Sequence, residues 1–99
     1  MTYKSCSTMA EVREEIDRLD REIVPLLVER LHFIKEAGRI KQSRDVVRDE
    51  WRVEDVVGKC LKTADALNGD VKMVEDVYRH LIEWSINHEF TVWDKEHTS

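Results

Sequence analysis

The sequence predicts an all-α protein of three helices, the first of them very long. Its 99 residues include only three glycines and one proline, with 41% hydrophobic and 37% charged residues. This composition is typical of soluble, helix-rich domains. Apolar residues recur at steps of three and four along most of the chain, which is the period of an amphipathic helix. No linker divides the sequence, so we expect one domain over residues 1–99.

The first helix is predicted from about Thr8 to Gln42. Either Ser7 or Thr8 can cap its start, and Glu11 is placed to complete a capping box with Thr8. Pro25 removes one backbone hydrogen bond, but the apolar pattern keeps its phase across it, so a kinked and continuous helix is expected. The stripe consists of Val12, Ile16, Leu19, Ile23 and Leu26, followed beyond Arg30 by Phe33, Ala37 and Ile40.

Two shorter helices follow. Asp49 can cap a second helix, whose apolar positions continue to the stop signal Asn68-Gly69. Asp70 can cap a third helix that extends to about Trp93. The three helices account for nearly all of the chain.

The length of the first helix predicts an assembly. A helix from Thr8 to Gln42 extends about 50 Å at ~1.5 Å per residue, whereas a compact chain of this size has a radius of gyration of about 13 Å. The first helix is therefore longer than a compact domain of this size, and part of its apolar stripe would be exposed to water at a cost in free energy. We expect an intertwined helical homodimer, in which a second copy covers the stripe.

Composition excludes several classes of function. Sixteen basic and 21 acidic residues give a net charge of −5, which argues against nucleic acid or an acidic membrane as partner. No signal-peptide core and no apolar run of about 18 residues is present, so a cytoplasmic protein is expected. Cys6 and Cys60 fit no disulfide or metal motif, and the four histidines lack metal-ligand spacing. No metal and no cofactor is predicted.

Cations interrupt the apolar stripe of the first helix. Lys41 follows Arg30 by eleven residues, which places them within about 20° around the helix and ~16 Å along it, so both can lean toward one space. Arg13 lies about 25 Å along the axis from Arg30, too far to join the same small pocket within one chain. Across a dimer it could reach the pocket of the other copy.

The third helix carries polar residues in its own apolar stripe. Ser85 and Glu89 are four residues apart and so share one face. Facing Arg30 and Lys41, they would form a cation-rich pocket suited to a compact ligand with two carboxylates. Taken singly, each of these residues is also explained as an ion-pair partner or a solvated charge.

The stretch VREEIDRLDREIVPLLVERLHFIKEAGRIK, residues 12–41, carries a family pattern. It resembles the first helix of the AroQ-class, all-helical chorismate mutases, which contain an arginine, then I-D-x-L-D, L-L-x-E-R and A/G-x-x-K. The resemblance covers a core of residues 9–93. It implies the chorismate mutase type II fold, an intertwined homodimer of three-helix chains.

The resemblance also implies a site. In it, Arg13 of one chain completes a pocket of the other, the arginines hold the substrate carboxylates, and Lys41 contacts the ether oxygen with help from Glu89. Such a site would convert chorismate to prephenate by positioning and electrostatic stabilisation, with no cofactor. The remaining implied residues are Arg30, Asp49, Arg52 and Ser85, with Ala37 and Ile82 as apolar walls.

Two departures from the family pattern leave the reaction open. The mutases usually carry a glutamate at position 53, where it contacts the ring hydroxyl. This chain has Val53 instead, as the isochorismate-pyruvate lyases do. Glu89 stands where bacterial relatives commonly have glutamine, and we expect it to act in its protonated form. The first prediction is a chorismate mutase. The alternatives are an isochorismate-pyruvate lyase, a 4-amino-4-deoxychorismate mutase, and a non-catalytic helical dimerisation module.

Overall fold

The computed structural model describes residues 3–98, which form three α-helices and one short 3₁₀ helix. Their order is α1 (Met9–Ile40), η1 (Arg44–Val46), α2 (Glu50–Ala66) and α3 (Val71–Glu96). No strand occurs within this described part, and the predicted all-α class is confirmed. The chain divides into two compact units, Met1–His32 and Phe33–Ser99, and the division falls within α1. Each unit is described by itself.

The start of α1 in the first unit has the predicted cap. The Thr8 hydroxyl accepts a hydrogen bond from the Glu11 backbone N–H at 3.2 Å, and the Glu11 carboxylate accepts one from the Ser7 N–H at 3.0 Å. The reciprocal bond thus goes to Ser7, one residue before the cap, and still satisfies a donor at the helix start. The helix is continuous through Pro25, as predicted.

The apolar stripe of the first unit is exposed. Ile16, Leu19, Ile23 and Leu26 keep 51%, 44%, 48% and 65% of their surface accessible. Among the described residues, every buried hydrophobic side chain belongs to the second unit. Burying an exposed Leu or Ile side chain stabilises a protein by about 1.5–3 kcal/mol, so a surface that covered this stripe would stabilise the protein substantially.

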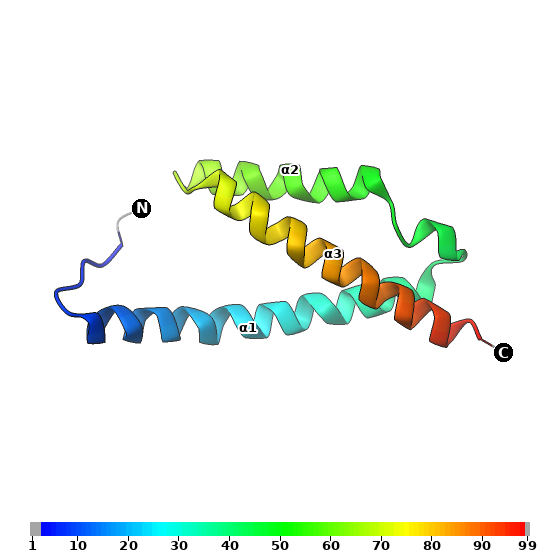
Figure 1. The fold of residues 1–99 in the computed structure, drawn as a ribbon, viewed down its shortest axis with the longest axis horizontal. Helices are drawn as coiled ribbons and strands as arrows, with labels where there is room; N and C mark the ends of the chain where they lie inside the picture. The colour runs from blue at the N-terminus through cyan, green and yellow to red at the C-terminus, as the bar shows by residue number, and fades with distance from the viewer. Residues whose placement is uncertain (1–2, 99) are drawn as a thin grey trace. The chain divides into compact units, whose positions relative to one another are not determined.

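In the second unit, α2 and α3 form an antiparallel hairpin (Figure 1). The carboxylates of Asp49 and Asp70 cap the two helices by accepting the N–H three residues further on, at 3.2 and 3.0 Å. Between the helices, Asn68 adopts a φ of 55° and the Gly69 N–H donates to the Ala64 carbonyl at 2.8 Å. A left-handed residue of this kind is a common way to end a helix. The predicted boundaries of both helices at this turn are confirmed.

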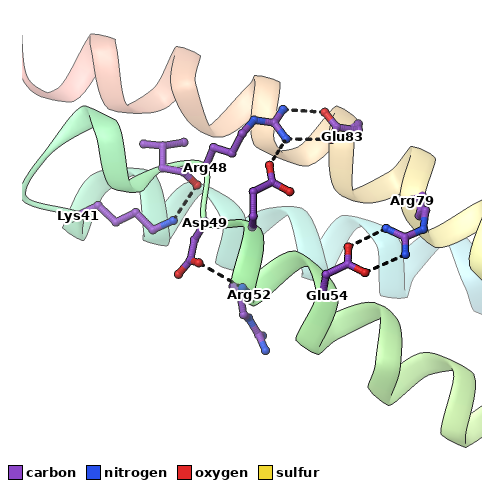
Figure 2. A network of polar contacts seen from close by, with 9 residues as sticks. Lys41, Arg48, Asp49, Arg52, Glu54, Arg79 and Glu83 are labelled. Carbon is purple, nitrogen blue, oxygen red and sulfur yellow. Dashed lines mark hydrogen bonds and ion pairs between the residues drawn. The ribbon is translucent and has the colours of Figure 1, made fainter.

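The core of the second unit lies between α2 and α3. It is built on Val53, Val57, Ile82 and Ile86, with Val56, Leu61 and Phe90 packed against it. At the edge of this core, the Arg79 guanidinium makes two hydrogen bonds to Glu54 at 2.9 and 3.0 Å (Figure 2). Two contacts from one planar group fix the register of the two helices better than a single ion pair does.

The segment between α1 and α2 contains η1, which the sequence did not predict. Arg44 in η1 reaches Asp94 at 2.8 Å and lies 4.6 Å above the Phe90 ring. Arg48 makes two hydrogen bonds to Glu83 at 2.9 and 2.7 Å (Figure 2). Asp94, Phe90 and Glu83 all belong to α3, so the segment is attached to that helix at two points. No helix in residues 3–98 is long and apolar enough to span a membrane.

Candidate active site

The centre of the site is a cation paired with a buried carboxylate. The Lys41 ammonium lies 2.6 Å from Oε2 of Glu89 and 3.2 Å from the Val47 carbonyl oxygen. The Glu89 side chain is only 6% exposed, whereas that of Lys41 is 30% exposed. Figure 2 shows Lys41 extended toward the loop before α2, with its bond to the carbonyl drawn. A charge-assisted hydrogen bond of this length is stronger than a neutral one.

A glycine allows this approach. Gly38 is buried, and a Cβ added to it would lie 3.0 Å from Cγ1 of Val92 and 3.1 Å from the Glu89 carbonyl oxygen. Both distances are shorter than nearly all real Cβ contacts, so a larger residue at this position would require α3 or the Val92 side chain to move by a few tenths of an ångström. Lys41 follows three residues later, within reach of Glu89.

Trp93 holds the backbone of Lys41, which sequence reasoning missed. Its indole N–H donates to the Lys41 carbonyl oxygen at 3.0 Å. The two residues are 52 positions apart, so no local pattern indicates the contact. A tryptophan in an apolar stripe is ordinarily expected to be a packing residue.

The buried face of α3 carries two further predicted residues. Ser85 is 3% exposed and Ile82 5% exposed, and with Glu89 they follow the helical spacing of three and four residues. The Ser85 hydroxyl donates to the Leu81 carbonyl at 2.7 Å, within its own helix. Ala37 is half-buried on α1, and its carbonyl accepts the Lys41 N–H at 3.0 Å.

Asp49 and Arg52 form local contacts. The Asp49 carboxylate accepts the Arg52 backbone N–H as the cap of α2, and the Arg52 guanidinium lies 2.6 Å from the Asp55 carboxylate (Figure 2 shows the cap). Hydrogen bonds from Lys59 and Arg52 hold the pKa of Asp55 below its usual value. The Arg52 side chain is 58% exposed. The ligand-binding roles of Asp49 and Arg52 stay predictions.

Val53 belongs to the core of the hairpin. It is 9% exposed and packs in one cluster with Val57, Ile82 and Ile86. It therefore shares an apolar surface with Ile82, the residue expected to form a wall of the site. A charged side chain at position 53 would have to be accommodated at the edge of this cluster.

Arg13 and Arg30 belong to the first unit. Both lie on α1, where Arg13 is exposed and Arg30 is half-buried. Their part in binding a ligand stays a prediction. In residues 3–98, no group of three or more His, Cys, Asp or Glu side chains is placed to hold a metal ion.

The fold and this site define an all-helical protein in which a cation–carboxylate pair joins the end of α1 to the buried face of α3. The family model for chorismate mutase type II matches residues 12–90. The chain is also 30% identical to the isochorismate pyruvate lyase of Pseudomonas aeruginosa over 92 residues, which are 93% of this chain and 91% of that protein. The chain belongs to the chorismate mutase type II family. The resemblance identified in the sequence is thereby confirmed.

Proposed function

We propose that the protein catalyses a pericyclic reaction that breaks the enolpyruvyl ether bond of a chorismate-like dicarboxylate. The observation that carries this proposal is the Lys41 ammonium, held 2.6 Å from the buried Glu89 carboxylate. Family membership supports an enzyme of the chorismate mutase type and a substrate of this class. The reaction needs no nucleophile, because the bonds form and break within the substrate.

Lys41 supplies the electrostatic part of the mechanism. As the carbon–oxygen bond stretches, negative charge gathers on the ether oxygen, and an ammonium at that point binds the transition state better than the substrate. Removing one such preorganised donor typically costs about 10²–10³ in rate. The Glu89 carboxylate and the Val47 carbonyl hold this ammonium in place.

Glu89 assists Lys41 by holding its ammonium in place. The Glu89 side chain is only 6% exposed and lies 2.6 Å from the ammonium, so the lysine side chain is anchored on the buried face of α3. An ammonium held in this way needs little reorganisation during the reaction.

The remaining predicted residues bind and orient the substrate. Arg30, with Arg13 from a second copy, holds the carboxylates, and bidentate arginine contacts suit this task. The exposed apolar stripe of the first unit supports a homodimer. A single domain over residues 1–99 stays a prediction. The other contacts are assigned to Asp49, Arg52 and Ser85, with Ala37, Val53 and Ile82 as apolar walls.

Two observations favour isochorismate as the substrate over chorismate, the first choice from the sequence. Val53 lies in the hairpin core and provides no carboxylate for the ring hydroxyl of chorismate. The 30% identical relative is named an isochorismate pyruvate lyase. In that reaction the ether bond breaks while one ring hydrogen moves to the enolpyruvyl methylene carbon. The ring becomes salicylate and the side chain leaves as pyruvate, so all atoms balance.

The mutase reaction is the second candidate, because the family model that matches 12–90 is that of chorismate mutase. Its products separate it cleanly from the lyase reaction. The 4-amino analogue of chorismate would give the amino counterpart of prephenate. A non-catalytic helical module would consume none of these compounds.

One assay decides among these functions. Isochorismate, chorismate and the 4-amino analogue are each incubated with the protein, and products are followed by proton NMR. We expect salicylate and pyruvate in equal amounts from isochorismate. If chorismate gives prephenate with a higher kcat/KM than the isochorismate reaction has, the protein is a mutase and not a lyase. Failure to consume any of the three would contradict the proposal as a whole.

A further inference from the structure

Lys41 is held at both of its ends by one face of α3. Its ammonium contacts Glu89 and its carbonyl oxygen accepts the Trp93 indole N–H at 3.0 Å. Glu89 and Trp93 are four residues apart, so their side chains stack on the same side of the helix. One turn of α3 therefore determines where the Lys41 backbone lies and where its side chain ends.

The carbonyl group that Trp93 contacts lies at the C-terminal end of α1. Since α1 ends at Ile40, the Lys41 carbonyl is among the last carbonyls that have no partner within the helix. Helix ends of this kind fray, and lysine has a long side chain with about 2 kcal/mol of rotamer entropy. If nothing held the Lys41 backbone, motion of the helix end would widen the range of positions that the ammonium can take.

Trp93 is itself fixed within α3. Its ring stacks on that of His97 with centroids 4.2 Å apart and planes 12° from parallel, and Nδ1 of His97 lies 2.9 Å from the Trp93 carbonyl oxygen. The side chain is half-buried. The indole N–H, which can only donate, is thus aimed at the Lys41 carbonyl by contacts independent of that bond.

We propose that Trp93 is a positioning residue that sets the Lys41 ammonium at the reacting ether oxygen through the hydrogen bond to the Lys41 carbonyl. This inference rests on the proposed function. By this inference the indole ring packs on its neighbours, and its N–H also raises the rate of the reaction. A preorganised ammonium costs little reorganisation during the reaction, and a displaced one loses part of its stabilisation of the transition state.

The test is a double-mutant cycle on the full chain. Trp93→Phe keeps an aromatic ring and removes the donor, and Lys41→Met removes the group through which Trp93 is proposed to act. The rates of isochorismate consumption are measured for the wild type, both single variants and the double variant. Where turnover is slow, single turnovers with excess enzyme give the rate of the chemical step.

We expect Trp93→Phe to lower kcat about five-fold, the usual size of one hydrogen bond, while KM stays within about two-fold. In the Lys41→Met background the same change should leave the residual rate within about two-fold. Trp84→Phe is the matched control, because Trp84 lies on the same helix and also stacks on a histidine four residues later, at 5.2 Å. It should leave the rate and the coupling to Lys41 unchanged.

Two results would overturn the positioning role: an unchanged kcat in the Trp93→Phe variant, or an equal loss in both backgrounds, as a purely structural effect would give. In either case a large loss on Lys41→Met alone keeps the proposed function. A Lys41→Met variant of wild-type rate overturns both proposals together. Where the Trp93→Phe chain does not fold, β-(3-benzothienyl)alanine at position 93, an isostere with sulphur in place of the N–H, keeps the test decisive.

Discussion

The Lys41 ammonium and the Glu89 carboxylate lie 2.6 Å apart, although 48 positions separate them in the sequence. The pair joins the end of α1 to the buried face of α3, and each partner constrains the other. A buried carboxylate needs a partner, and a flexible ammonium needs a fixed point. The effects expected of substitutions in the enzyme follow from this pair and from the residues that hold it.

Replacing Glu89 by alanine is expected to lower kcat more than replacing it by glutamine. Alanine removes the acceptor that lies 2.6 Å from the Lys41 ammonium. Glutamine keeps an oxygen that can accept a hydrogen bond from the ammonium, so part of the positioning of Lys41 should survive. The measurement is kcat for both variants and the wild type at saturating substrate.

Glu83→Ala is the matched control for the alanine variant. Glu83 lies on the same helix, is exposed and pairs with Arg48, whose hydrogen bonds lower the pKa of this carboxyl group. Its substitution should leave kcat unaltered. A Glu89→Ala enzyme with the kcat of the wild type would show that Lys41 does not depend on Glu89 for its position.

Gly38→Ala is expected to destabilise the protein and disturb the site. The new Cβ would lie 3.0 Å from a Val92 methyl carbon and 3.1 Å from the Glu89 carbonyl oxygen, and the latter cannot move without the helix. Overpacking of this kind costs about 1–3 kcal/mol, which outweighs the ~1 kcal/mol that alanine gains over glycine inside a helix. Denaturant unfolding measures the loss, and kcat should fall with it because Lys41 shifts.

Gly58→Ala provides the opposite expectation. Gly58 lies within α2 with nothing within 4 Å of an added Cβ, so alanine should stabilise the protein by about 0.5–1 kcal/mol. A Gly38→Ala protein that is as stable as Gly58→Ala would contradict the close packing of the end of α1 on α3.

The helix boundaries were predictable because their causes are local. Asp49 and Asp70 reach backbone groups three residues away, and the Asn68-Gly69 turn completes itself within a few residues. The Arg52–Asp55 pair also follows a three-residue spacing and could have been anticipated. The family resemblance placed Arg52 in the ligand site, and the neighbouring Asp55 was not considered there.

The contacts that build the site are long-range, and sequence reasoning reached only part of them. The Lys41–Glu89 pair was expected from the family resemblance and from polar residues in apolar stripes. The Trp93 bond to Lys41 and the close approach at Gly38 depend on how α1 meets α3, which no local propensity encodes. The helix η1 was missed because a single 3₁₀ turn carries almost no sequence signal.

A mixing experiment tests whether Arg13 acts across two copies. Arg13→Ala and Lys41→Met chains should each be nearly inactive alone. In a mixed dimer, one site receives Lys41 from one chain and Arg13 from the other, whereas the second site lacks both. Random exchange of chains should therefore restore about a quarter of the sites. The measurement is activity after co-refolding, with sedimentation to confirm a dimer, and no recovery in mixed dimers would contradict the shared site.

The rate of isochorismate consumption by the Lys41→Met protein tests most directly whether Lys41 stabilises the transition state. We predict a loss of about 10²–10³ in kcat relative to the wild type, because the charge at the ether oxygen is gone. Lys59→Met, which removes an exposed ammonium paired with Asp55 on α2, should keep the wild-type rate. Circular dichroism and sedimentation confirm that both variants fold and assemble. A Lys41→Met protein that turns over isochorismate within about three-fold of the wild-type rate would show that Lys41 does not stabilise the transition state. Removal of a group that contributes a factor of about 10² or more must cause a larger loss of rate.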